Sequence, residues 1–182
     1  MNAHPLQNIA IASLALMALL LLAMPIDAQP LDDWSNNKGA VRVEPNVVTG
    51  LIAWIVAKTG WVVQEPPSIR FVPQTQLVEM YFGGNSSSND IQIGALYLAK
   101  SHIVYLPEKW NPNDLHDRSA LLHELVHHLQ ALNNVKAKCL AAYDRQAFDL
   151  QFEWLREQGI QDPYKFIDID EFTIRLLSQC PG

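Results

Sequence analysis

The strongest pattern in the chain is an apolar stripe with a helical repeat over residues 114–132. Its members gather on one side of a helix: Leu115, Leu121, Leu122, Leu125, Val126, Leu129 and Leu132. Such a stripe is typical of an amphipathic helix that packs on a hydrophobic core. Asn113 or Asp114 can cap the first turn, and Asn133 predicts the end.

Other segments predict the remaining elements of a mixed fold. Strands are expected at Ile69–Val72, Ile91–Tyr97 and His102–Leu106, the last two joined as an antiparallel hairpin through Leu98–Ser101. Further helices are expected at Val47–Lys58, Pro73–Phe82, Lys138–Gln158 and Asp162–Leu177. The pattern therefore predicts one α+β domain over residues 46–182, with a small antiparallel sheet packed against the helix at 114–132.

This helix carries the pattern His-Glu-x-x-His at His123, Glu124 and His127. Residues four apart lie one helical turn from each other, so both imidazoles can reach one zinc ion. Glu124 points about 100° further round the helix, where it can take a proton from water on the metal. The spacing predicts a zinc ion held by His123 and His127, with Glu124 as general base.

A plainer interpretation is an amphipathic helix with histidines on its solvated face. The metal site is favoured because the motif coincides with the helical phase. The leucines form the apolar stripe, and His123 and His127 fall roughly opposite its centre. The helix thus offers one face to the core and the other to a cleft.

A catalytic zinc site needs a third protein ligand, and the next helix offers one. Only two polar residues, Asp144 and Gln151, fall within the apolar face of this helix. A buried carboxylate needs a partner or a metal, so Asp144 is the predicted third ligand. The alternative is that Asp144 orients His123 or His127 from behind. We interpret Gln151 as a buried structural hydrogen-bonding residue.

Residues that assist the metal site are not decided by the sequence. His128 is interpreted as a core histidine with satisfied hydrogen bonds. An oxyanion can be stabilised by any of four candidates: Tyr97, His102, Tyr105 and Tyr143.

The N-terminus contains an apolar run at Ile9–Ala23 that is short for a membrane span. It predicts a signal peptide over residues 1–28, followed by a polar lead-in over residues 29–45. An uncleaved N-terminal membrane anchor is the alternative. Both interpretations place the domain outside the cytoplasm, as a periplasmic or secreted protein.

The two cysteines, Cys139 and Cys180, both lie after the predicted signal peptide. In an oxidising compartment such a pair predicts a disulfide. The bond would join the segment after the His-Glu-x-x-His helix to the C-terminus.

The net charge of −6 arises from 19 acidic and 13 basic residues with no basic block. This balance argues against nucleic acid or an anionic membrane surface as the main partner. The expected partner is a peptide or protein substrate, with membrane contact only through an uncleaved N-terminus. The oligomeric state is left open.

With its His123–His127 motif and the Asp144–Phe148 segment, the chain resembles the zincin metallopeptidases, specifically small gluzincin-like members of an exported, bacterial type. The second segment is similar to Glu-x-x-Ala-Asp, in which Glu supplies the third ligand. Here Asp144 replaces that Glu and Phe148 replaces the final Asp. The resemblance implies a zincin-like fold and zinc-dependent peptide hydrolysis. The alternative is a catalytically inactive exported domain that binds a peptide or protein.

Overall fold

The computed structural model describes residues 45–83, 91–139 and 141–180. The predicted signal peptide at residues 1–28 lies outside these residues, as does the lead-in apart from Pro45. Among the helices that the structure describes, none has the length and hydrophobicity needed to cross a bilayer.

The sheet has three strands: β1 (Ser68–Val72), β2 (Leu96–Leu98) and β3 (Ile103–Pro107), in the order β1-β3-β2. The predicted antiparallel hairpin is confirmed for β2 and β3. The prediction of a wholly antiparallel sheet is wrong, because β1 pairs with β3 in parallel. Helix α2 (Gln74–Phe82) lies within the long connection between these strands, and this connection allows the parallel pairing.

The first hairpin strand is shorter than predicted, since residues 91–95 form no strand. At Gly94 this segment runs close against the helix that carries Ala120. A Cβ added to Gly94 would come within 2.9 Å of the Cβ of Ala120. The alternating pattern of the segment therefore reflects packing on a helix as well as strand pairing, which begins only at Leu96.

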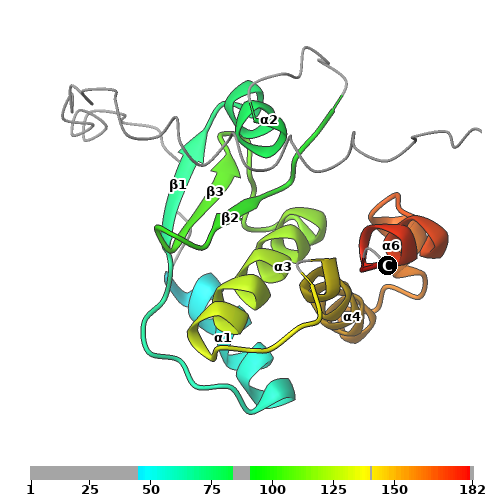
Figure 1. Cartoon of the computed structure of the whole chain (residues 1–182). Helices are drawn as coiled ribbons and strands as arrows, with labels where there is room; N and C mark the ends of the chain where they lie inside the picture. The colour runs from blue at the N-terminus through cyan, green and yellow to red at the C-terminus, as the bar shows by residue number, and fades with distance from the viewer. Residues whose placement is uncertain (1–44, 84–90, 140, 181–182) are drawn as a thin grey trace, which may run out of the picture. The chain divides into compact units, whose positions relative to one another are not determined.

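Helix α3 (Leu115–Leu132) occupies the centre of the fold, as Figure 1 shows. It contacts β2 and β3 on one side, and α1 (Pro45–Thr59) and α4 (Ala141–Glu157) elsewhere. Asp114 caps its first turn by accepting hydrogen bonds from the backbone N–H groups of His116 and Asp117. Its apolar stripe is fully buried at five positions: Leu121, Leu122, Leu125, Val126 and Leu129. The apolar stripe thus holds α3 in the core and fixes its rotation.

The C-terminal region differs from the single helix predicted over 162–177. It contains two short helices, α5 (Pro163–Phe166) and α6 (Glu171–Leu177). The chain leaves the helical conformation between them, where Asp168 has a φ of 54°. Asp170 then starts α6 by accepting a hydrogen bond from the N–H of Thr173. The domain is therefore α+β, with a small three-stranded sheet and several helices.

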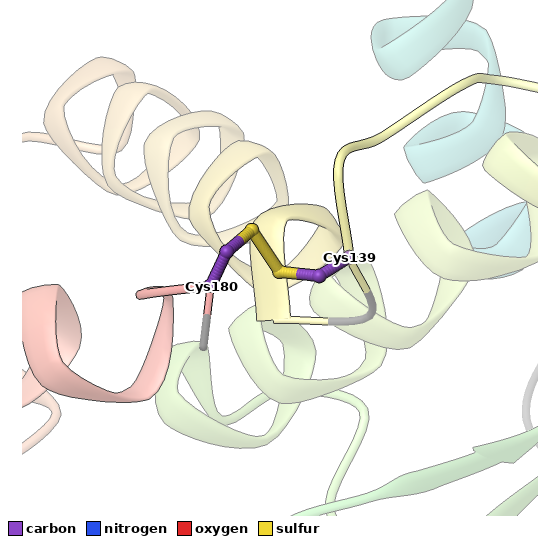
Figure 2. Close-up of a disulfide and its surroundings, with 2 residues drawn as sticks. All are labelled: Cys139 and Cys180. Carbon is purple, nitrogen blue, oxygen red and sulfur yellow. A yellow bond between two sulfur atoms is a disulfide. The ribbon is translucent and has the colours of Figure 1, made fainter. Parts of the chain in front are cut away.

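The predicted disulfide between Cys139 and Cys180 is confirmed, with Cα atoms 5.6 Å apart. Figure 2 shows that it joins the segment leading into α4 to the chain that follows α6. The bond anchors the chain that follows α6 beside the start of α4.

Candidate metal centre and adjoining cleft

Three side chains from α3 and α4 bring one ligand atom each to the same point. His123 and His127 lie one turn apart on α3, and their Nε2 atoms are 3.2 Å from each other. The Oδ1 atom of Asp144, in the first turn of α4, lies 3.2 Å from Nε2 of His127 and 3.8 Å from Nε2 of His123. The three atoms form a group that has the donor types and spacing for a metal ion.

Two glutamines fix the orientation of the imidazoles. The Nδ1 atom of His123 lies 3.0 Å from Oε1 of Gln151, and that of His127 lies 2.9 Å from Oε1 of Gln130. An amide oxygen only accepts, so each Nδ1 must carry the proton. In a neutral ring the Nε2 atom is then unprotonated and offers a lone pair to the shared point.

The orientation of each glutamine amide is itself fixed by further contacts. The Nε2 atom of Gln130 donates to the backbone carbonyl of Tyr143 and to Oε1 of Gln146, both at 3.1 Å. The Nε2 atom of Gln151 donates to the hydroxyl of Ser119 at 3.2 Å. That hydroxyl donates onward to a backbone carbonyl, so it accepts from Gln151. The amide oxygens are therefore directed at the histidines by the surrounding hydrogen bonds.

Asp144 lies on the Nε2 side of both histidines, where a metal ligand belongs. A carboxylate that oriented the rings from behind would contact Nδ1, and both Nδ1 atoms already face glutamines. Its side chain is 41 % exposed, so the expectation of a buried carboxylate was too strong. The reason is its place in the first turn of α4, at the edge of the helix pair.

Electrostatics at the site favour charge separation between the histidines and Asp144. Burial raises the pKa of Asp144, but the hydrogen bonds with His123 and His127 outweigh it and hold that pKa well below its usual range. Burial lowers the pKa of His127, yet Asp144, Glu124 and Gln130 together raise it above its ordinary value. The ionised carboxylate of Asp144 thus favours a positive charge beside it, which can be a proton on His127 or a bound metal ion.

Glu124 is held beside the metal group by the edge strand. Its Oε2 atom accepts a hydrogen bond of 2.8 Å from the backbone N–H of Tyr97 in β2. One carboxylate oxygen is therefore anchored to the sheet. The close approach at Gly94, two residues before Leu96, keeps this strand near α3.

A cleft of about 430 Å³ adjoins the metal group on the side of His127. It is bordered by His127 and Gln130 on α3, Tyr143 on α4, Tyr97 on β2, and the segment Asn134–Lys136. A substrate in this cleft would lie directly beside the point where the three ligand atoms meet.

Two of the four residues considered for oxyanion stabilisation, Tyr143 and Tyr97, have hydrogen-bonded hydroxyls. Tyr143 donates its hydroxyl to the backbone carbonyl of Val135, so its proton supports the local structure. The Tyr97 hydroxyl lies 3.2 Å from Nδ1 of His128, whose Nε2 lies 2.9 Å from the carbonyl of Glu65. Because that carbonyl only accepts, a neutral His128 accepts at Nδ1 from Tyr97. Burial lowers the pKa of His128, consistent with its interpretation as a core histidine.

Gln130 is the functional residue that the sequence interpretation missed. It lies three residues after His127 on the same helix, a spacing at which side chains meet. That spacing was a usable signal. The partner of Gln151 was not visible, because it depends on how α4 packs against α3.

A family model described as "Domain of unknown function (DUF6647)" matches residues 40–181. The match includes α3, α4 and all residues of the metal group. No curated protein and no solved structure matches the chain.

Proposed function

The chain belongs to the DUF6647 family, and we propose that it is a zinc-dependent peptidase with a zincin-like active-site helix. The proposal rests on the geometry of the site, because the description of the family names no activity. His123, His127 and Asp144 would hold the zinc ion, and Glu124 would act as general base. Export, proposed from the apolar N-terminal run, agrees with the disulfide, which persists in oxidising compartments.

One observation carries the proposal. The Nε2 atoms of two imidazoles and a carboxylate oxygen converge on one point. The Nδ1 atom of each imidazole is held by a glutamine amide oxygen. Two lone pairs 3.2 Å apart would repel each other, so the two Nε2 atoms need either a proton or a metal ion between them. Two nitrogens and one oxygen are a donor set that zinc accepts in catalytic sites, leaving further positions open.

When bound, zinc would lower the pKa of a coordinated water to about 7 and polarise the substrate carbonyl. Glu124 would accept the proton of the attacking water and deliver it to the leaving amine. The Tyr97 N–H, which holds Oε2 of Glu124, would keep that carboxylate beside the reacting atoms. Gln130 and Gln151 would keep both imidazole Nε2 atoms directed at the metal.

Zinc stoichiometry of the purified chain is the first test. We expect one zinc per chain in the wild type, none with His127→Ala, and weakened binding with Asp144→Ala. His116→Ala is the matched control, since His116 lies on α3 but outside the metal group. A folded wild type that takes up no zinc, even after incubation with the metal, rules out the metal site and the peptidase.

Glu124→Gln separates a peptidase from an inactive binding domain. The amide oxygen of glutamine can still accept from the Tyr97 N–H, but it cannot take a proton from water. We expect full zinc content and loss of hydrolysis of a peptide mixture, measured by mass spectrometry. If the zinc-loaded wild type also leaves every peptide intact, the inactive binding domain is the better description.

A further inference from the structure

We propose that the cleft beside His127 receives a carboxylate group of the peptide substrate, with the ammonium group of Lys136 as its counter-charge. The inference rests on the proposed peptidase activity and adds the class of substrate. The carboxylate can come from an acidic side chain or from the C-terminus of the peptide.

The charge of the cleft differs from that of the whole chain. The chain carries 19 acidic and 13 basic residues. Among the described residues that line the cleft, none is acidic, and Lys136 supplies the positive charge beyond the metal group. Within the described part of the chain, Lys136 makes no ion pair with a carboxylate of the protein. Its ammonium group is therefore free to pair with a ligand.

The backbone that carries Lys136 is held in place by its neighbour. The N–H of Val135 donates to the carbonyl of Gln130 at 3.0 Å, and its C=O accepts from the Tyr143 hydroxyl at 2.9 Å. Asn133 anchors the start of the segment, because its side chain exchanges two hydrogen bonds with the backbone of Val62. This wall of the cleft is preorganised, so binding does not require the loop to order first.

The distance between Lys136 and the metal group suits a substrate residue close to the scissile bond. The N–H of Val135 donates to the carbonyl of Gln130, three residues after His127, and this hydrogen bond holds the backbone beside Lys136 within one to two turns of His127 along α3. One to two turns of α3 correspond to about 5–10 Å along the helix. An extended peptide spans this length with about two or three residues. The remaining lining includes Ala99, Ala131 and two tyrosines, which suits the apolar stem of such a residue.

The test is cleavage of two peptide pools by the zinc-loaded chain, with cleavage sites read by mass spectrometry. One pool keeps free C-terminal carboxylates, and in the other these are amidated. We expect an acidic side chain or the free C-terminal carboxylate to be enriched within about three positions of the cleaved bond. If the preference persists in the amidated pool, the side chain is the source; if it requires a free terminus, the terminal carboxylate is the source.

Variants at two lysines provide the control. We expect Lys136→Glu to reduce kcat/KM for acidic peptides about fivefold or more, to spare neutral peptides, and to favour basic ones. Lys136→Arg should keep the wild-type preference. Lys138→Glu changes the charge equally but lies outside the cleft lining, and it should leave the preference unchanged.

The outcomes also separate the two proposals. Cleavage that favours neither an acidic residue nor a free C-terminus near the cleaved bond, or equal effects of Lys136→Glu and Lys138→Glu, overturns the carboxylate site and leaves the peptidase standing. No cleavage of either pool by the zinc-loaded wild type overturns both.

Discussion

Gln130 accepts a hydrogen bond of 2.9 Å from Nδ1 of His127, one turn earlier on α3. The same amide donates to the backbone carbonyl of Tyr143, the residue that precedes Asp144. One side chain therefore contacts the ring of one candidate metal ligand and the backbone beside another. This arrangement couples the position of His127 to the docking of α4.

Removing this amide should weaken zinc binding. Gln130→Leu leaves the Nδ1 proton of His127 and the carbonyl of Tyr143 without their partner, so both ligands lose orientation. We expect zinc affinity to fall by roughly 10–100-fold, measured by competition with a chromophoric chelator.

Gln146→Leu is the matched control, because Gln146 contacts the Gln130 amide but neither histidine. It should have a much smaller effect. If Gln130 acts through Asp144 as well as His127, its effect should shrink in an Asp144→Ala background, and full additivity would contradict that coupling.

Zinc binding should release a proton from His127. In the zinc-free chain the pKa of His127 is raised above its ordinary value, so the ring stays protonated to higher pH. The pKa of Asp144 is lowered, so its carboxylate is already ionised and contributes no proton. Zinc competes with the proton on His127, and its affinity should therefore fall as the pH decreases, starting at a higher pH than for a histidine with an ordinary pKa.

Calorimetry in two buffers of different ionisation enthalpy measures this proton release directly. Asp144→Asn removes the carboxylate that raises the pKa of His127, so this variant should release fewer protons. Binding enthalpies that are the same in both buffers would contradict the assigned protonation state.

Gly94→Ala should destabilise the fold. The added methyl group would lie 2.9 Å from the Cβ of Ala120, a contact that α3 and the segment before β2 can relieve only by moving apart. Overpacking of this kind costs about 1–3 kcal/mol, measurable by urea denaturation.

Gly50→Ala is the control, since an added Cβ at this position in α1 meets nothing within 4 Å. Alanine is a better helix former than glycine, so this variant should gain up to about 1 kcal/mol. Equal stability of the two variants would show that the contact at Gly94 relaxes freely.

The disulfide should contribute measurably to stability. Cys139 and Cys180 are separated by 41 residues, a loop for which the chain-entropy model gives about 4 kcal/mol. We expect reductant to lower the urea midpoint of the wild type towards that of a Cys139→Ser, Cys180→Ser double variant. The double variant should not respond to reductant, and a chelator in every sample removes any contribution from zinc.

The features that were predicted correctly depend on local patterns. The apolar stripe and the Asp114 cap place α3, and helical phase places His123 and His127 together. The parallel pairing of β1 with β3 was missed, because it depends on contacts between distant segments.

The break between α5 and α6 was missed for a different reason. Partly buried apolar residues such as Phe166, Ile167 and Ile169 continue through it and mimic one helix. Asp144 was selected for its position on the apolar face, yet it lies near the surface at the start of α4. The choice of residue stands as a prediction, while its assumed burial was wrong.

The three candidate metal ligands come from two helices, and this has a thermodynamic consequence. His123 and His127 come from a single turn of α3, whereas Asp144 reaches them only when α4 is packed in place. An unfolded chain can offer the histidine pair at most, so the three-ligand site exists only in the native state. Zinc would then shift the folding equilibrium by mass action, and its concentration would set the fraction of chains in which α3 and α4 are packed together.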